Sequence, residues 1–228
     1  IEDAAEVHGA EYLRGHTSAE GQWQRCGSFG ELSTFSFYAN KIITTGEGGM
    51  VLTDDPGYAE RLRGFRNLCF RPERRFYHTE LGNNYRLTNM QAAIGVAQVA
   101  QIEQFLAHKR WMGQRYTEQL QGIEGLHLPV EEPWARHVYW MYGVVLDEAR
   151  GLDAETFAAR LAERDVQTRP FFLGMHEQPV FQKMGLFEAE HYPIAERLAR
   201  QGLYLPSGLA LTESQLDRVC AAVRGVLA

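Results

Sequence analysis

The stretch that decides the fold is Thr34-Phe-Ser-Phe-Tyr-Ala-Asn-Lys-Ile-Ile-Thr-Thr-Gly-Glu-Gly-Gly-Met50. Its aromatic, hydroxyl-rich first part, Thr34 to Tyr38, predicts a short buried strand. A second strand is predicted from Gly48 to Thr53, and Lys41 lies in the polar loop between the two. A lysine between buried strands is poorly placed to be a solvated charge, and a buried, neutral amine can attack a carbonyl group. The alternative is an ordinary loop lysine that reaches solvent, and the residue pattern alone favours it.

Length and composition narrow the classes of protein. The chain has 228 residues, enough for one large domain or two small ones, and 45% of them are hydrophobic. Its net charge of −6 argues against a surface for nucleic acid or for an anionic membrane. The most apolar run, Ala92 to Ile102, is too short and too polar to span a membrane. The three cysteines are far apart with no C-x-x-C, so neither a metal site nor a disulfide framework is expected, and a reducing cytoplasm fits.

The first ten residues, Ile1-Glu-Asp-Ala-Ala-Glu-Val-His-Gly-Ala10, place a carboxylate where a strand should end. Asp3 there suits a ligand crevice at the carboxyl edge of an α/β sheet. The commoner reading of such a pattern is an aspartate that caps a helix. The segment has no initiator methionine and no signal peptide, so we expect the chain to be the C-terminal portion of a longer protein.

A long connection from Asn67 to Leu87 leads into a helix signal. Thr88-x-x-Gln91 is a capping box, which predicts a helix running from Thr88 towards Gly122 and bridging two domains. Connections of this length often carry function or cover an interface. Beyond Gly125, strand-like and helix-like segments alternate as in a small α/β domain. The connection contains three basic residues, Arg71, Arg74 and Arg75. They could bind phosphate groups, or they could be solvent-exposed charges without a ligand.

Three segments together carry a resemblance that spans nearly the whole chain. They are Glu2-Asp-Ala-Ala-Glu-Val-His-Gly-Ala10, Ser36 to Met50, and Gly82-Asn-Asn-Tyr-Arg-Leu-Thr-Asn-Met-Gln-Ala-Ala93. In this order they resemble the DegT/DnrJ/EryC1/StrS family of sugar aminotransferases, and within it most of all the GDP-perosamine synthases. The resemblance implies an α/β protein of fold type I of the pyridoxal-phosphate enzymes, which is the aspartate-aminotransferase-like fold. Residues 1–105 would be the later part of an incomplete large domain, and residues 106–228 the small C-terminal domain.

The resemblance also implies roles for single residues. Lys41 would form the Schiff base with pyridoxal phosphate and later move a proton as base and acid. Asp3 would pair with the pyridine nitrogen, and Ser36 would contact the cofactor phosphate. The remaining implied cofactor contacts are Glu6, where the family often has Gln or His near the phenolic oxygen, and Asn84, which would reach the partner subunit's cofactor phosphate. Substrate contacts are expected from Arg86, Arg169 and His176. The alternative is stabilisation of the loop for Arg86 and packing for His176.

The implied reaction is amination of a nucleotide-linked 4-keto-6-deoxy sugar, with L-glutamate as the amino donor. The favoured substrate is GDP-4-keto-6-deoxymannose. The implied setting is a cytoplasmic homodimer with shared active sites, in a route such as lipopolysaccharide O-antigen synthesis. Two alternatives stay open: a non-catalytic partner or remnant of the same fold, and a pyridoxal-phosphate dehydratase acting on the same sugars. Relatives of the dehydratase type have histidine in place of Lys41, so the lysine argues against the second alternative.

Overall fold

The computed structural model describes residues 1–15, 21–71, 73–74 and 76–228. Arg75, expected in the basic run, and part of the polar segment between Arg14 and Arg25 lie outside the described residues. The chain forms two compact units. Unit 1 comprises Ile1–Ala107 with Glu132–Trp140, and unit 2 comprises His108–Glu131 with Met141–Ala228. The assignment of 1–105 and 106–228 to a large and a small domain remains a prediction.

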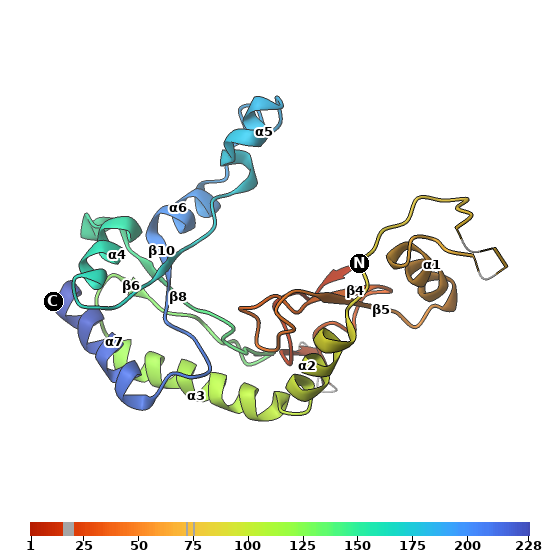
Figure 1. The fold of residues 1–228 in the computed structure, drawn as a ribbon. Coiled ribbons are helices and arrows are strands. Elements are labelled where there is room, and N and C mark those ends of the chain that lie inside the picture. The colour runs from red at the N-terminus through yellow and green to blue at the C-terminus, as the bar shows by residue number, and fades with distance from the viewer. Residues whose placement is uncertain (16–20, 72, 75) are drawn as a thin grey trace. The chain divides into compact units, whose positions relative to one another are not determined.

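The segment around Lys41 is built on a three-stranded sheet in unit 1 (Figure 1). Its order is β1 (Glu2–Asp3), β4 (Ser33–Ser36) and β5 (Gly49–Leu52), with β1 parallel and β5 antiparallel to β4. The two strands predicted around the lysine loop are therefore present. The expectation that both are buried is wrong, because every residue of β5 is exposed on this edge strand and only Ser33 of β4 is buried.

A side chain of β1 fixes the chain just before β4. The Glu2 carboxylate accepts hydrogen bonds from the backbone N–H groups of Gly27, Phe29 and Gly30, at 2.5, 2.8 and 3.3 Å. Burial acts to raise the pKa of this carboxyl, but the amide donors outweigh burial and lower it. Glu2 therefore stays charged and ties β1 to the entry of β4.

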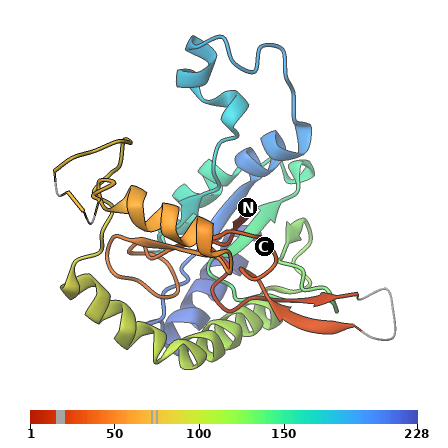
Figure 2. The same cartoon turned by 90° about the vertical axis from the view of Figure 1, so that its right-hand side faces the viewer.

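The polar segment after residue 10 forms a second small sheet, of order β3-β2-β7. Its strands are β2 (Glu11–Arg14), β3 (Gln22–Arg25) and β7 (Ala135–Arg136), and Figure 2 shows β2 and β3 side by side as a ribbon. The pairing of β2 with β7 brings a segment from late in the chain back to unit 1. As a result, Val138, Tyr139 and Trp140 are buried in unit 1.

The helices of unit 1 begin at capping residues, but the helix after Thr88 is divided in two. Asp55 caps α1 (Pro56–Arg66), and the Thr88–Gln91 capping box opens α2 (Asn89–Val99). The single long helix expected from Thr88 is instead two, because α2 ends and α3 (Ile102–Leu120) begins after Gln101. The Gln101 side chain donates to the Ala97 carbonyl at 3.3 Å. The Gln101 backbone N–H donates to Gln98 instead, so the regular helical pattern is interrupted there.

Unit 2 is an antiparallel sheet surrounded by helices (Figure 1). Its strand order is β6 (Leu126–His127), β8 (Tyr142–Leu146), β10 (Gly202–Leu205) and β9 (Arg169–Pro170). The core includes Tyr116, Tyr142 and Phe157, all fully buried. The helices are α4 (Ala154–Ala162), α5 (Pro179–Lys183), α6 (Pro193–Gln201) and α7 (Glu213–Leu227), with 3-10 turns at Glu148–Arg150 and Met175–Glu177. Across the described residues, no helix combines the length and apolar character needed to cross a membrane.

Candidate active site

The Lys41 loop is a closed turn between β4 and β5. The Phe37 N–H donates to the carbonyl of Gly48 at 2.9 Å, and the Phe37 carbonyl accepts from the Thr45 N–H at 3.0 Å. These two hydrogen bonds close the loop at its base. Ile42 and Ile43 are buried and anchor it. Gly48 has a φ of +151°, and a Cβ there would lie 2.6 Å from Thr45 Oγ1, so only glycine fits.

The side chain of Lys41 is enclosed, with 9% of it exposed. Its Nζ lies 2.9 Å from Oε1 of Glu6 and 4.2 Å from the ring centroid of Trp140. The indole Nε1 of Trp140 donates to the carbonyl of Asn40 at 2.7 Å, which holds the ring beside the loop. The geometry does not fit a solvated loop lysine, because two side chains from other segments surround the amine.

Asp3 is the last residue of β1, and Glu6 lies in the turn that follows it. No helix begins there, so Asp3 is not a helix cap; its Oδ1 accepts the Ala5 N–H at 3.1 Å and shapes a turn instead. Glu6 is half-exposed, and its carboxylate reaches Lys41 across the sheet. The pairing of β1 with β4 places Asp3 opposite Thr34, two residues before Ser36. Three of the expected cofactor contacts thus lie on two paired strands and the turn beside them.

His8 is buried in the same unit and interacts with both Lys41 and Ser36. Burial, and then the positive charge of Lys41, lower the pKa of His8 to about 4, against the opposing effect of a hydrogen bond to the Ser36 backbone. Its Nε2 has no partner among the described residues, so Nδ1 makes that bond. His8 is therefore a neutral imidazole that holds the end of β4.

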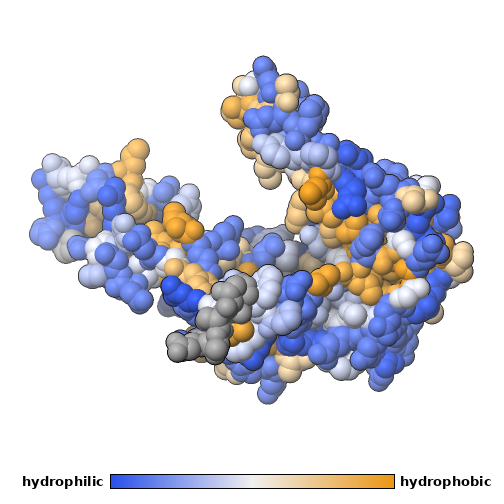
Figure 3. Space-filling model, turned by 180° about the vertical axis from the view of Figure 1, so that it is seen from behind, coloured by the Kyte–Doolittle hydropathy of each residue, from blue (hydrophilic) through white to orange (hydrophobic). Residues whose placement is uncertain are grey.

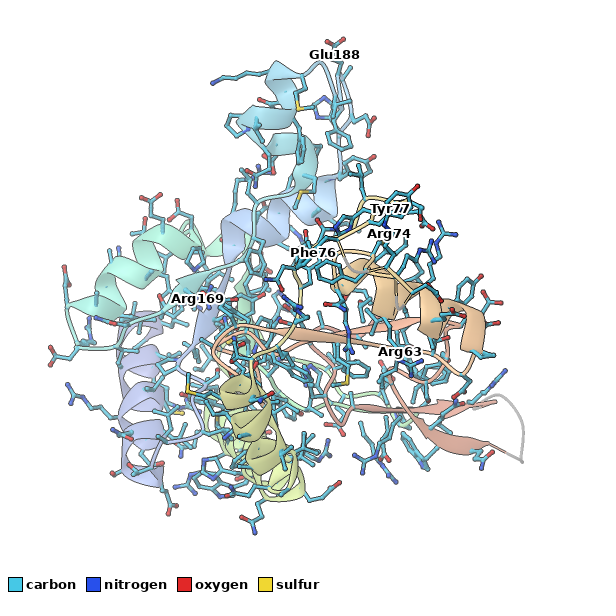
Figure 4. The ribbon with its side chains drawn as sticks, turned by 45° about the vertical axis from the view of Figure 1, so that its right-hand side comes forward. Arg63, Arg74, Phe76, Tyr77, Arg169 and Glu188 are labelled. Atoms are coloured by element: carbon cyan, nitrogen blue, oxygen red, sulfur yellow. The ribbon has the colours of Figure 1, made fainter. Side chains whose placement is uncertain are left out.

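Asn84 and Arg86 meet on the connection between α1 and α2. The Arg86 guanidinium donates to Oδ1 of Asn84 at 3.1 Å and to Oδ1 of Asn67 at 2.7 Å. Because a guanidinium only donates, Arg86 fixes the oxygen of the Asn84 amide, and the NH₂ group takes no part in this contact. Both residues are exposed. Arg86 thus acts at least as a support for Asn84. Figure 4 shows Arg74, Phe76 and Tyr77 on the same connection.

The two other expected substrate contacts lie in unit 2. Arg169 is exposed on β9 (Figure 4). His176 is buried, and its Nε2 lies 3.2 Å from the Glu196 carboxylate while its ring packs edge-on against Tyr192. Hydrogen bonds, first of all from the Tyr192 N–H and then from His176, lower the pKa of Glu196. His176 therefore has a charged partner within its own unit.

Sequence reasoning missed Trp140 as a neighbour of Lys41. The two residues are far apart in the chain, and no spacing rule links them.

The residues around Lys41 fit pyridoxal phosphate. The loop presents an amine for an aldehyde, and the neighbouring strands carry a hydroxyl and carboxylates. Asn40 Oδ1 and His8 Nε2 are buried polar atoms without a partner among the described residues. Buried polar groups are normally paired, so these two atoms are exceptions that a polar ligand would satisfy.

The chain matches known proteins along nearly its whole length. The DegT/DnrJ/EryC1/StrS aminotransferase family matches residues 1–224. The chain is 38% identical to the GDP-perosamine synthase of Caulobacter vibrioides over 100% of its own length, and 34% identical to that of Escherichia coli O157:H7 over 98%. The crystal structure of S. venezuelae DesV in complex with a ketimine intermediate matches 98% of this chain, with a TM-score of 0.83 and 32% identity.

These matches bear on the fold and the cofactor. The chain spans 58%, 57% and 56% of the three matched proteins, so it corresponds to little more than half of each. The predicted fold type I with an incomplete large domain is confirmed. Pyridoxal phosphate is the cofactor that the family and its relatives support. The chain belongs to the DegT/DnrJ/EryC1/StrS aminotransferase family.

Proposed function

We propose that the protein containing this chain transfers the amino group of L-glutamate to the keto carbon of a nucleotide-linked 4-keto-6-deoxy sugar. The observation that carries the proposal is the enclosed Lys41 amine, held by Glu6 on a glycine-bounded loop. The first candidate substrate is GDP-4-keto-6-deoxymannose, because two of the most similar relatives are named GDP-perosamine synthase. A cytoplasmic location and a role in lipopolysaccharide O-antigen synthesis belong to the same proposal.

When bound, pyridoxal phosphate supplies an aldehyde for a lysine amine and a ring that withdraws electrons from the carbon bearing the amino group. Lys41 is the amine that would hold it. Asp3 would keep the ring nitrogen protonated, and Ser36 would donate to the phosphate. The Lys41 amine would take the proton from Cα of the amino donor at Nζ as a base, and would later give a proton back from Nζ as an acid. The Glu6 carboxylate would accept a hydrogen bond from Nζ and so keep the amine oriented.

Three residues are proposed as substrate contacts, each considered within its own unit. Arg86 of unit 1 and Arg169 of unit 2 are exposed and positively charged, which suits a phosphate group of a nucleotide sugar. His176 of unit 2 already has Glu196 as a partner, so it would contact substrate with that carboxylate behind it. We also propose a homodimer in which Asn84 donates to the phosphate held by the partner subunit.

One experiment tests the activity directly. The complete protein encoded by the gene is incubated with L-glutamate and a panel of nucleotide keto sugars, and products are identified by mass. We expect a product in which an amino group replaces the keto oxygen, with GDP-4-keto-6-deoxymannose consumed fastest. A product that has lost water without gaining nitrogen would indicate a dehydratase. No reaction, in a protein shown to bind the cofactor, would contradict the proposal.

A further inference from the structure

Unit 2 carries an arm, residues 175–192, which follows β9 and ends where α6 begins. Figure 1 shows α5, the helix of the arm, on a segment that projects beyond α6. We propose that the arm of one copy of this chain docks onto the connection between α1 and α2, residues 67–87, of a second copy. The proposal rests on the homodimer of the proposed function and adds to it a pair of surfaces that join the two copies.

The base of the arm is held by one carboxylate. Glu196 on α6 accepts the Tyr192 N–H at 2.8 Å, and the same oxygen lies 3.2 Å from Nε2 of His176. The two ends of the arm are therefore joined through Glu196. Within the arm, the rings of Phe181 and Phe187 pack edge-on, with their centroids 6.0 Å apart. The arm is thus an ordered element, and docking it costs little conformational entropy.

Beyond this base, the arm exposes apolar side chains to solvent. Val180 and Met184 are 58% and 65% exposed, and Leu186 is exposed as well. Burial of apolar surface is the main favourable term in protein association, and exposed apolar surface of this kind marks interaction sites. The arm therefore presents a face that suits a partner with an apolar surface of its own.

The connection between α1 and α2 has a surface of the matching kind. Tyr77, Leu81 and Tyr85 are exposed on it. The connection contains four arginines and two glutamates, a net charge of +2, whereas the arm contains one lysine and three glutamates, a net charge of −2. Surfaces of opposite charge attract each other and disfavour other partners. A second copy of this chain therefore offers the arm both apolar contact and opposite charge.

Each surface also carries a charge that its own chain leaves without an ionic partner. Among the described residues, Glu188 of the arm makes no ion pair. Arg74 of the connection contacts only the ring of Tyr77, at 4.7 Å, and both charged residues are labelled in Figure 4. Because every copy has one arm and one connection, a symmetric dimer makes this contact twice.

The test places a light-activated cross-linker on the arm of the complete protein. Lys183, exposed on α5, is replaced by a lysine analogue that carries a diazirine, and the rest of the arm is unchanged. After irradiation at low protein concentration, denaturing electrophoresis separates single chains from linked pairs, and mass spectrometry maps the linked peptides. We expect a linked pair of chains, joined from position 183 to a peptide within residues 67–87.

The same analogue at Glu163, which is exposed at the end of α4 in unit 2, is the matched control and should give no link to that peptide. Links within single chains only, links between chains at another segment, or no link at all from position 183 would each overturn the proposal.

Charge reversal tests the complementarity of the two surfaces. Glu188→Lys and Arg74→Glu should each lower the yield of the link about twofold to fivefold, and the two changes together should recover most of it. Glu163→Lys reverses an exposed charge outside the arm and should leave the yield unchanged. A double variant that links no better than the single variants would contradict the docking of the arm on the connection.

Cross-linking needs neither substrate nor cofactor. A failed amination assay therefore leaves the docking of the arm intact, and a protein that aminates the sugar without forming the link loses only this inference.

Discussion

In the proposed function, Lys41 is the residue on which the chemistry depends. We expect Lys41→Ala to abolish amination and to leave pyridoxal phosphate bound without a covalent link, because the Ala side chain has no amine to attack the aldehyde. Borohydride reduction followed by mass spectrometry checks the link. Lys183 on α5 is exposed, so Lys183→Ala is the matched control and should behave as the unaltered protein does. Cofactor still fixed to the Lys41→Ala protein would place the covalent link elsewhere.

His8 predicts a dependence of stability on pH. Its pKa is about 4 in the folded protein, below the ordinary value of 6.5 for a histidine side chain. The unfolded chain therefore binds more protons as pH falls from about 6.5 to about 4, and folding stability should fall over that window. Above it, the contribution is fully present.

The His8→Leu variant tests this window. It should lose about 1 kcal/mol at pH 7 from the missing hydrogen bond to Ser36, yet lose less additional stability between pH 7 and pH 5 than the unaltered protein does. Urea denaturation at the two pH values measures both effects. Exposed His191, replaced by Asn, controls for the loss of an imidazole. An unchanged difference between pH 7 and pH 5 in the Leu variant would contradict the prediction.

At the scale of elements, the start of α2 links stability to the site. Thr88 caps the helix with Gln91, whose amide also donates to the carbonyl of Glu47 in the lysine loop at 3.0 Å. Thr212 and Gln215 make the same capping box at α7, in unit 2. We expect Thr88→Ala and Thr212→Ala each to cost about 1 kcal/mol of stability in denaturant unfolding.

Only the Thr88 change should also weaken cofactor binding. It loosens Gln91 and the connection that carries Asn84, whereas α7 supports no residue of the proposed cofactor site. Fluorescence titration with pyridoxal phosphate distinguishes the two variants. Equal effects on binding would mean that the cap of α2 does not support the lysine loop.

The sequence predicted elements where the cause is local. The strands around Lys41 and the capping box at Thr88 depend on neighbouring residues, and the structure confirms them. At Gln101 the side-chain amide, and not the backbone N–H, donates to the carbonyl of Ala97, and the helix breaks there. The spacing of apolar residues does not reveal such a break. The contact between Lys41 and Trp140 depends on β7 pairing with β2, a tertiary event without a local signal.

At the scale of the whole molecule, the described surface carries many exposed apolar residues (Figure 3). On α2 they include Met90 and Val96, which are 78% and 72% exposed, and on the connection before it Tyr85, which is 76% exposed. Apolar surface of this kind next to Asn84 is what a subunit interface would cover.

The last prediction is that Asn84 serves the cofactor site of the partner subunit. Asn84→Ala removes a neutral donor to a charged phosphate, so cofactor affinity should fall about tenfold to a hundredfold without unfolding. Complementation isolates the cross-subunit claim. In a mixed dimer of Asn84→Ala and Lys41→Ala, a shared arrangement gives one site with both residues and one with neither. Activity should then exceed that of either parent at matched cofactor. If subunit exchange is demonstrated by mass and activity does not return, Asn84 acts within its own chain.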